Sequence, residues 1–393
     1  MTAFTVRAHR KLPEYLVTTK EISVEHRSFE SPIRAREIDQ FEEGEELLDV
    51  AYGVSEVYIE VSTQDLHNLA DGSNAEFEKA IADQRAAIRD DELAVAILAY
   101  SGHGIVNIKG MEVLVDVLDE HFDVLVGLLM SQQLDAVDDL DANPEPYNRF
   151  VENTERLLGS VERVATNLAI LGTIPILSRG RMEELVDVQI ASGVDGFCVD
   201  FLDKKPTARQ RVTRRIAPLM ERLGSEQAYH TSLLYAVNAY RGRNLTGTSR
   251  SPAENYFVFG LGFDVLGGRY YFSRGGWGGD DEIQVCWFDS DTYEQEYISV
   301  DLLRDELPEQ TGLDKDYILE MVHDDDQRGR IQVLLETERM NVAYDELRRA
   351  IQDGRTSEFV TEKQGTLDWI ENIMVTVQGA YDEGRSSPSV TSY

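Results

Sequence analysis

From residue 93 onward, short apolar runs alternate with stretches in which hydrophobic residues recur every three or four positions. The apolar runs are rich in Val, Ile and Leu, which is typical of strands buried on both faces. The expected strands are 94–101, 123–131, 168–177, 196–202, 230–237 and 263–268. The expected helices between them are 110–122, 146–164, 181–192, 208–223 and 253–260. Strands that alternate with helices in this way predict parallel βα units.

This succession predicts an α/β fold built on a (β/α)8 barrel of the TIM type. No GxGxxG motif lies near the first turn, which argues against a dinucleotide-binding sheet. We expect residues 1–92 to form an N-terminal α/β extension that packs on the barrel, with strands at 2–8 and 55–62 and a helix at 74–89. Residues 93–384 are expected to form the barrel and its C-terminal helices, and 385–393 a mobile tail. Outside the βα units, the expected elements are a strand at 282–288 and helices at 325–354 and 363–384.

The charge balance indicates a high-salt environment. The chain carries 38 Lys+Arg against 72 Asp+Glu, a formal net charge of −34, and only eight of its basic residues are lysines. Such a chain repels itself in dilute buffer, whereas at molar salt the Debye length falls to about 3 Å and screens most of the repulsion. We therefore expect a protein of an extreme halophile or its virus, acting in a high-salt cytoplasm.

Several classes of protein are excluded by what the sequence lacks. It has no apolar run long enough to span a membrane and no apolar segment near its N-terminus, so neither a membrane span nor a secretion signal is expected. The two cysteines, Cys198 and Cys286, can build neither a disulfide framework nor a Cys-rich zinc site. No P-loop, HExxH or His/Cys cluster occurs, so we predict neither a metal nor another cofactor.

Positive charge is concentrated in one segment. Between Lys204 and Arg274 there are twelve basic and four acidic residues, so this segment carries +8 and the rest of the chain −42. Its densest part, KKPTARQRVTRR at 204–215, has six cations and no anion. One explanation is a helix face whose arginines pair with nearby carboxylates. In so acidic a chain we favour a polyanionic ligand, because Lys and Arg neutralise phosphates and release counterions.

Candidate chemistry comes from the rule that side chains at the carboxyl ends of barrel strands face the active site. Asp200 lies within an apolar strand, where an unpaired carboxylate is costly, so we expect it to have a partner or a ligand. The segment 260–279 combines glycines, which allow close approach to a ligand, with aromatic residues on which bases can stack. A purely structural glycine-rich turn is the alternative. The residues that the rule nominates are Ser101, His103, Asp200, Asp203, Asn238 and Asp264.

Three segments resemble a known enzyme family. The segment GFDVLGGRYYFSRGG (262–276) resembles the GxDxFDxxxxxxxARxG segment of tRNA-guanine transglycosylases. YSGHG (100–104) stands where that family has its DSGGF element, and LLETERMNVAYDELRRAIQDGRTSEF (334–359) is similar to its late helix. The residues of this helix that match in register are Asn341, Arg349, Ala350, Ile351, Gly354 and Phe359.

The resemblance implies a barrel enzyme that replaces a guanine by a 7-deazaguanine through a covalent aspartyl–nucleic acid intermediate. The target nucleotide would have to leave its stack. The sequence departs from the family at both carboxylate positions: Tyr100 stands at the first catalytic aspartate and Gly267 at the nucleophile, with Asp264 at the preceding aspartate. In addition, Met340 replaces a histidine, and of the family's Cys-rich zinc site only Cys286 remains.

We therefore expect Asp264 to be the nucleophile, reached by a small local shift, and His103 to be the second catalytic residue. The expected partners are a nucleic acid and a free 7-deazaguanine base, and a homodimer is one expected assembly. DNA is favoured over tRNA because the chain lacks the C-terminal RNA-binding domains of archaeal tRNA members. The residues expected to bind the base are Ser101, Gly102, Asp200, Asn238, Gly262 and Phe263. Those expected to bind the nucleic acid are Lys204, Lys205, Arg209, Arg211, Arg214, Arg215, Arg269 and Arg274.

Four alternatives remain open. The chain could be a tRNA-guanine transglycosylase, or a catalytically inactive homologue that binds nucleic acid or a partner protein. An unrelated barrel enzyme acting on a phosphorylated metabolite would use the arginines to hold the phosphate. A structural protein of a halophilic virus or mobile element is the fourth. A barrel fold by itself does not choose among them.

Overall fold

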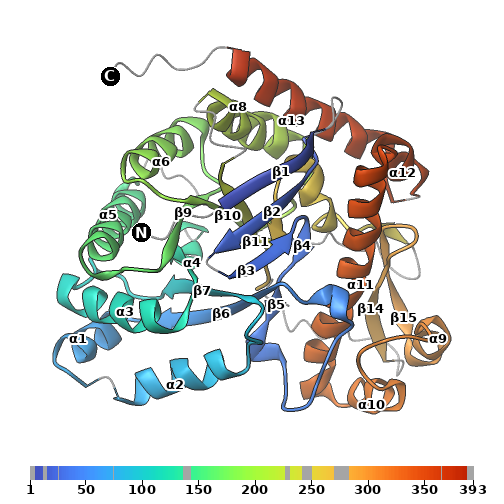
Figure 1. Ribbon diagram of the computed structural model, residues 1–393, viewed down its shortest axis with the longest axis horizontal. Helices are drawn as coiled ribbons and strands as arrows, with labels where there is room; N and C mark the ends of the chain where they lie inside the picture. The colour runs from blue at the N-terminus through green and yellow to red at the C-terminus, as the bar shows by residue number, and fades with distance from the viewer. Residues whose placement is uncertain are drawn as a thin grey trace.

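The structure is a computed structural model that describes residues 5–11, 16–24, 26–73, 75–135, 143–225, 231–240, 250–269, 283–363 and 365–386. Its centre is a parallel sheet with the strand order β4-β13-β11-β10-β9-β8-β7-β6-β5 (Figure 1). The two edge strands, β4 (Ile33–Arg34) and β5 (Arg36–Glu37), are separated only by Ala35. Both ends of the sheet therefore belong to one chain segment, and the sheet closes into the predicted barrel.

The barrel strands are buried on both faces, which explains their nearly continuous apolar sequence. In β7, Val95 and Ile97 face the barrel interior, whereas Ala96 and Leu98 pack against the surrounding helices. The long barrel strands are β6 (Val54–Val61), β7 (Leu93–Tyr100), β8 (Val124–Leu129), β9 (Ala169–Pro175), β10 (Gly196–Lys204) and β11 (Leu233–Ala239). The short strand β13 (Val265–Leu266) pairs in parallel with β11 on one side and β4 on the other.

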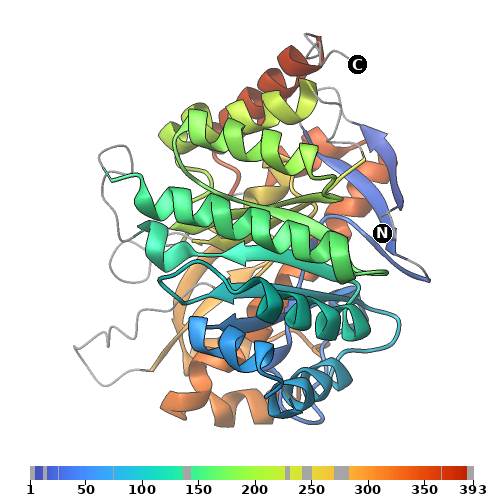
Figure 2. The same cartoon turned by 90° about the vertical axis from the view of Figure 1, so that its left-hand side faces the viewer.

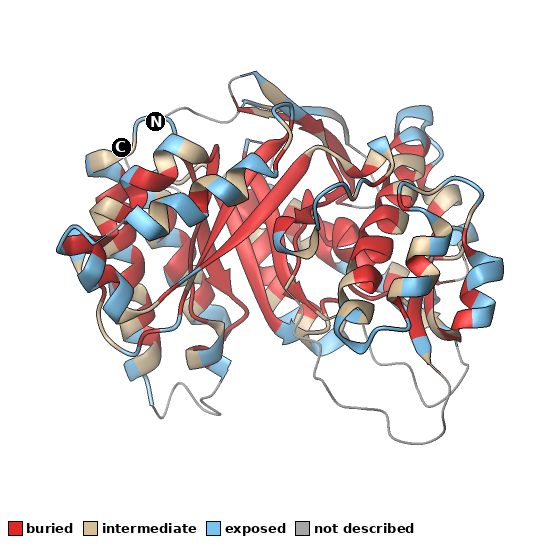
Figure 3. Ribbon diagram, turned by 90° about the horizontal axis from the view of Figure 1, so that it is seen from below, coloured by how far each residue is buried: buried red, intermediate tan, exposed pale blue. Residues whose placement is uncertain are grey.

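Helices return the chain from the end of one strand to the start of the next, and all of them except the short turn Arg209–Arg211 bury residues against the barrel (Figures 2 and 3). Helix α3 shows the local signals: the Asn107 side chain caps its N-terminus by accepting from Gly110 N–H at 3.1 Å. Gly110 also allows α1 to approach closely, because a Cβ there would lie 1.9 Å from the carbonyl oxygen of Leu66. These helices are α1 (Thr63–Ala70), α2 (Ala75–Ala86), α3 (Ile108–His121), α4 (Ser131–Asp135), α5 (Glu145–Val164), α6 (Arg179–Ala191), α7 (Arg209–Arg211), the π-helical turn η3 (Val212–Ile216) and α8 (Ala217–Ser225).

A small antiparallel sheet lies across the amino end of the barrel (Figures 1 and 2). It consists of β1 (Thr5–Lys11), β2 (Thr18–Val24) and β3 (Arg27–Glu30). Ile22, Val24 and Phe29 join the apolar side chains of the barrel interior in one buried cluster. The interior of the barrel is therefore closed at this end and opens toward the opposite end, where the strands finish.

The C-terminal part adds a second antiparallel sheet and a layer of helices. The sheet order is β12-β15-β14, and its core is separate from that of the barrel. The long helix α11 packs on β4, where the side chain of Asn341 bonds both the backbone N–H and the carbonyl oxygen of Arg34 at 2.9 Å. The elements are β12 (Ser251–Pro252), β14 (Gln284–Asp289), β15 (Glu294–Ser299), α9 (Val300–Glu306), α10 (Lys315–Met321), α11 (Asp325–Asp353), α12 (Thr356–Glu362) and α13 (Asp368–Ser386). The remaining 3₁₀ turns are η1 (Ile38–Gln40), η2 (Asp49–Ala51) and η4 (Tyr256–Leu261).

The predicted alternation of strands and helices is confirmed, but two expectations need correction. The boundary at residue 92 is wrong, because β6 pairs in parallel with β7 along its whole length and β4 and β5 also belong to the barrel. The strand expected at 282–288, outside the βα units, is β14 of the second antiparallel sheet. The helix expected at 253–260 is the 3₁₀ turn η4. Of the expected tail, 387–393 lie outside the described residues.

Candidate functional site at the barrel mouth

The barrel mouth, where the carboxyl ends of the strands meet, holds a buried carboxylate. Asp200 in β10 accepts hydrogen bonds from the side-chain amide of Asn238 at 2.8 Å, from the backbone N–H of Leu202 at 2.9 Å, and from the hydroxyl of Ser131. Burial raises the pKa of Asp200, and these donors oppose that shift because they favour the charged form. Within the described part of the chain, no Lys or Arg forms an ion pair with it. The expectation that Asp200 has partners is confirmed.

The backbone is strained at the same end of the barrel. Leu202, Asp203, Asn238 and Arg269 have positive φ angles of 51°, 53°, 53° and 44°, at the ends of β10, β11 and β13. Positive φ is unfavourable for residues with a Cβ, and such residues cluster at functional sites. Burial, followed by the charges of Asp200 and Asp135, raises the pKa of Asp203 to about 6. Of the five positive-φ residues with a side chain in the described part of the chain, four therefore lie at this end of the barrel; the fifth, Tyr293 (φ 63°), lies between β14 and β15.

A cavity of about 70 Å³ opens at the barrel mouth. Ser131 and Asn238 line it, so Asp200 lies one hydrogen bond below its surface. Its polar groups are mainly hydroxyls and amides, since the two charged residues, Glu60 and Arg269, form an ion pair with each other. The lining consists of Tyr58, Glu60, Ala99, Tyr100, Ser101, Leu129, Ser131, Gln132, Gln133, Asn238 and Arg269. The cavity therefore suits a small, polar, uncharged group.

A second group of acids is buried in the barrel interior near the end of β13. Glu56 accepts hydrogen bonds from the hydroxyl of Tyr235 and the backbone N–H of Gly268, both at 2.5 Å. Glu37 pairs with Arg34 at 3.0 Å. Burial, followed by the charge of Glu37, raises the pKa of Glu56 to about 8, so Glu56 carries a proton at neutral pH.

These acids fill the space beside Gly267 and Gly268. A Cβ at Gly267 would lie 2.7 Å from Glu56 Oε2, and one at Gly268 would lie 1.7 Å from Glu37 Oε1. The carboxyl group of Glu56, from β6, thus occupies the space next to Gly267, the position at which the resemblance implies a nucleophile. Tyr100, at the other aligned position, packs outward and its hydroxyl lies 2.8 Å from the hydroxyl of Thr63.

Three of the expected site residues follow β7, and only one of them lies at the barrel-mouth cavity. Ser101 lines the cavity. Gly102 is buried against Tyr100, whose hydroxyl would lie 2.4 Å from a Cβ at that position. His103 is exposed and is not among the residues that line the cavity. The structure therefore brings together Ser101, Asp200, Asn238 and Arg269 from the expected set, and leaves His103 outside.

Asp264 lies at the opposite end of the barrel, and Gly262 and Phe263 do not line the cavity. Asp264 precedes β13, is 2% exposed, and pairs with Lys20 of β2 at 2.9 Å. It also accepts from Ser31 and from Leu234 N–H. The expectation that Asp264 faces the active site is wrong, because it comes before its strand and not after it. Gly262 and Phe263 precede it and are buried; Phe263 packs in the apolar layer outside the barrel strands, where it contacts Phe201 of β10 edge to face.

The basic segment runs along the rim of the barrel mouth, since α7 follows directly after β10. Lys204 and Lys205 pair with Asp135 and Glu254, at 2.8 and 2.7 Å. The arginines of α7 and η3 form no ion pair with a carboxylate of the described residues. Arg211 and Arg215 donate to backbone carbonyl oxygens. Arg209 and Arg214 are exposed. Arg274 lies outside the described residues, as do the aromatic residues at 270–277.

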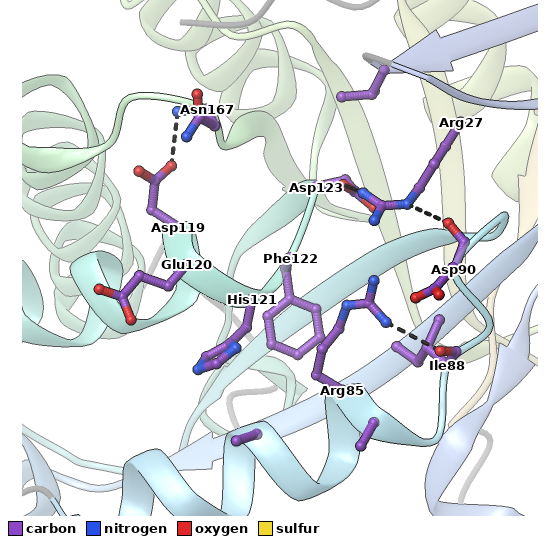
Figure 4. A pocket seen from close by; sticks show the side chains of 13 residues that line it. Arg27, Arg85, Ile88, Asp90, Asp119, Glu120, His121, Phe122, Asp123 and Asn167 are labelled. Carbon is purple, nitrogen blue, oxygen red and sulfur yellow. Dashed lines mark hydrogen bonds and ion pairs between the residues drawn. The ribbon is translucent and has the colours of Figure 1, made fainter.

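A larger cavity, of about 520 Å³, lies at the amino end near the starts of β7 and β8 (Figure 4). Its charges are largely satisfied within the protein: Arg27 pairs with Asp123, and Arg85 donates to the carbonyl oxygen of Ile88 at 3.1 Å. Asp119 accepts from the backbone N–H groups of residues 166–168. Residues at this end of a barrel usually serve stability, so we place the candidate site at the barrel mouth.

Three residues of the barrel mouth and its surroundings were not predicted from the sequence: Ser131, Tyr58 and Glu56. Glu56 and Tyr58 both lie in the alternating strand pattern at 55–62. An acid in such a strand needs a partner or a ligand, as argued for Asp200, so the sequence did carry a signal for this strand. Ser131 directly follows an apolar strand, so the rule used for Ser101 also applied to it.

The described part of the chain contains no group of three or more His, Cys, Asp or Glu side chains that could hold a metal ion. Cys286 is buried in β14, and its N–H donates to the side chain of Gln332 at 3.1 Å. Among the described helices, none is both long and apolar enough to cross a membrane. No protein-family model and no characterised protein matches the sequence.

Proposed function

We propose that this protein exchanges a guanine for a 7-deazaguanine in a nucleic acid at the barrel mouth, with Asp200 as the attacking carboxylate. One observation carries the proposal: Asp200 is a buried acid with no cationic partner in the described part of the chain, and it lies directly beneath a polar cavity. A buried carboxylate is expensive, and its position at the carboxyl ends of barrel strands is where catalytic groups collect.

The chemistry is a double displacement. An oxygen of Asp200 attacks the anomeric carbon of the nucleotide, and the glycosidic bond breaks as guanine leaves with the bonding electrons and takes up a proton. The nitrogen of the incoming base then attacks the same carbon, loses its proton and displaces the carboxylate. Protons and electrons balance over the two steps, so no other reactant is needed. Ser131 and Asn238 each hold one oxygen of Asp200 and orient the group.

The size of the cavity and the charge at its rim support a nucleic acid as the substrate. A cavity of about 70 Å³ admits a small planar group but not a stacked duplex, so the target nucleotide would have to flip out. Arg209 and Arg214 are exposed beside the barrel mouth without a carboxylate partner among the described residues, in a chain of net charge −34. Phosphates are the natural partners of such arginines.

The test is base exchange by the full chain in about 2–3 M KCl, which screens the acidic surface. Labelled guanine or 7-deazaguanine is incubated with duplex DNA and, separately, with tRNA, and the washed polymer is counted. We expect label to enter DNA with the parent and not with Asp200→Asn, which keeps the size of the side chain. Asp264→Asn is the matched control and should retain exchange in whatever fraction stays folded. Incorporation into tRNA alone would replace DNA as the substrate, and full activity of Asp200→Asn would refute the assignment.

Binding without exchange is the second candidate function. It is favoured by the outward-facing Tyr100 and by Gly267, which has no side chain. It predicts that the parent binds DNA but incorporates no label, and that Asp200→Asn binds equally well.

A further inference from the structure

Two arginines of the basic segment are held partly buried at the barrel mouth without an opposite charge. Arg211 donates to the carbonyl oxygen of Lys205, and Arg215 donates to that of Ile176 at 2.9 Å. Lys205 and Ile176 are the first residues after the neighbouring strands β10 and β9. Among the residues that the structure describes, neither arginine forms an ion pair with a carboxylate. Both guanidiniums are therefore fixed at the end of the barrel where the strands finish.

The two positive charges act on each other. Burial, followed by the charge of Arg215, lowers the pKa of Arg211. The charge of Glu254 opposes this shift, but its carboxylate already accepts from Lys205 at 2.7 Å and from Thr207 at 2.5 Å. A guanidinium keeps its proton at any working pH. Two cations that are partly removed from water thus lie near each other, and an anion would stabilise this arrangement.

Both side chains keep a donor that a ligand can reach. In each guanidinium Nη1 bonds the backbone, whereas Nη2 is neither bonded to a described residue nor enclosed by protein. Nε of Arg211 is enclosed, so Nη2 is the donor that remains on that side chain. Arg215 lies in the π-helical turn η3, and such turns are frequent at functional sites.

We infer that Nη2 of Arg211 and Nη2 of Arg215 together bind a phosphate group of the nucleotide whose base enters the barrel mouth. The inference rests on the proposed function, because that function supplies a nucleotide as the ligand. A phosphate offers several oxygens to two guanidiniums at once, and the N–H donors of arginine match its geometry.

The strand ends connect this phosphate site with the candidate nucleophile. The backbone N–H of Ile176 donates to the carbonyl oxygen of Asp200 at 2.9 Å, and the carbonyl oxygen of the same residue accepts from Arg215. The phosphate therefore lies over the strand that carries the attacking carboxylate or over its neighbour. It follows that the ligand of the barrel mouth is a phosphorylated nucleotide and that a free nucleoside binds poorly.

The experiment compares two ligands that differ only in their phosphates, and it measures binding and not exchange. Deoxyguanosine 3′,5′-bisphosphate and deoxyguanosine are titrated into the full chain in about 2 M KCl by calorimetry. The parent should bind the bisphosphate about tenfold or more tightly than the nucleoside, because charge-assisted hydrogen bonds are the stronger ones. The double variant Arg211→Gln, Arg215→Gln should lose this preference and keep the parent's affinity for the nucleoside.

The double variant Arg149→Gln, Arg179→Gln is the matched control, because it removes two positive charges elsewhere on the barrel. Arg149 pairs with Glu145 and Arg179 with Glu183, both at 2.7 Å. This variant should keep the parent's preference for the bisphosphate, so that a change in net charge alone is excluded as the cause of the loss.

A second measurement needs no variant. Phenylglyoxal modifies accessible arginines, and bound bisphosphate should slow the modification of Arg211 and Arg215 in the parent but not that of Arg179, as read by peptide mass spectrometry. Equal affinity of the parent for the two ligands, an unchanged preference in the Arg211, Arg215 variant, or the absence of protection would overturn the inference. A preference that depends on these two arginines in a protein without exchange activity would uphold the inference and reject the exchange proposal.

Discussion

The buried acid Glu56 makes a quantitative prediction for the pH dependence of stability. Its pKa is about 8 in the folded chain against an ordinary value of 4.5, chiefly because of burial. Between these two pH values the folded state keeps a proton that the unfolded state has lost. The free energy of unfolding therefore falls as pH rises through this range, by about 1.4 kcal/mol for each pH unit. Over the whole range the loss is about 5 kcal/mol, and above pH 8 Glu56 adds nothing further.

Glu56→Gln removes this titration but keeps the shape of the side chain and an acceptor for Gly268 N–H. The window from pH 6 to 8 is the most informative, because the pKa of Asp203 is about 6 and its titration contributes mainly below that window. Across it the parent should lose about 2–3 kcal/mol more than the variant. Urea unfolding at constant 3 M KCl, followed by tryptophan fluorescence at pH 5, 6, 7 and 8, measures both curves.

The measurement at pH 5 is the control. A difference between the parent and Glu56→Gln in the free energy of unfolding at that pH reports the change in packing and hydrogen bonding alone. Parallel curves for parent and Glu56→Gln between pH 6 and 8 would show that Glu56 titrates normally. That result would refute the argument from burial and from the charge of Glu37.

Two further changes test the amino end and the rim of the barrel. Lys20→Met leaves the carboxylate of Asp264 buried without its cation and should lower the free energy of unfolding by about 3–5 kcal/mol; a decrease below about 1 kcal/mol would contradict the buried ion pair. The double variant Arg209→Glu, Arg214→Glu should weaken DNA binding and reduce the salt dependence of log K by about one for each phosphate that is no longer neutralised, with little change in melting temperature. Fluorescence anisotropy of labelled DNA across a KCl series measures this binding constant. An unchanged slope of log K against log[KCl] would show that the DNA does not contact Arg209 and Arg214.

Most of the barrel could be predicted from the sequence because its signals are local. The runs at 94–101 and 168–177 are apolar on both faces, and the structure has strands at Leu93–Tyr100 and Ala169–Pro175. Asp200 stood out for the same reason, since a polar residue in such a run needs a partner. The closing strands could not be predicted in this way, because β4, β5 and β13 have two residues each and show no periodicity.

Composition and local pattern were enough to establish the class of fold, the acidic character of the chain, the basic segment and the need of Asp200 for partners. Which polar residues share one end of the barrel depends instead on the three-dimensional pairing of the strands. Asp264 and Asp200 look alike in sequence, yet Asp264 precedes its strand and pairs with Lys20, whereas Asp200 lies in β10 where the pairing with β9 ends, beside Asn238. A residue just before the two-residue strand β13 lies at the amino end of the barrel, and a residue just after it lies at the barrel mouth. That difference depends on the pairing of β13 with β4 and β11, and β4 is far away in the sequence.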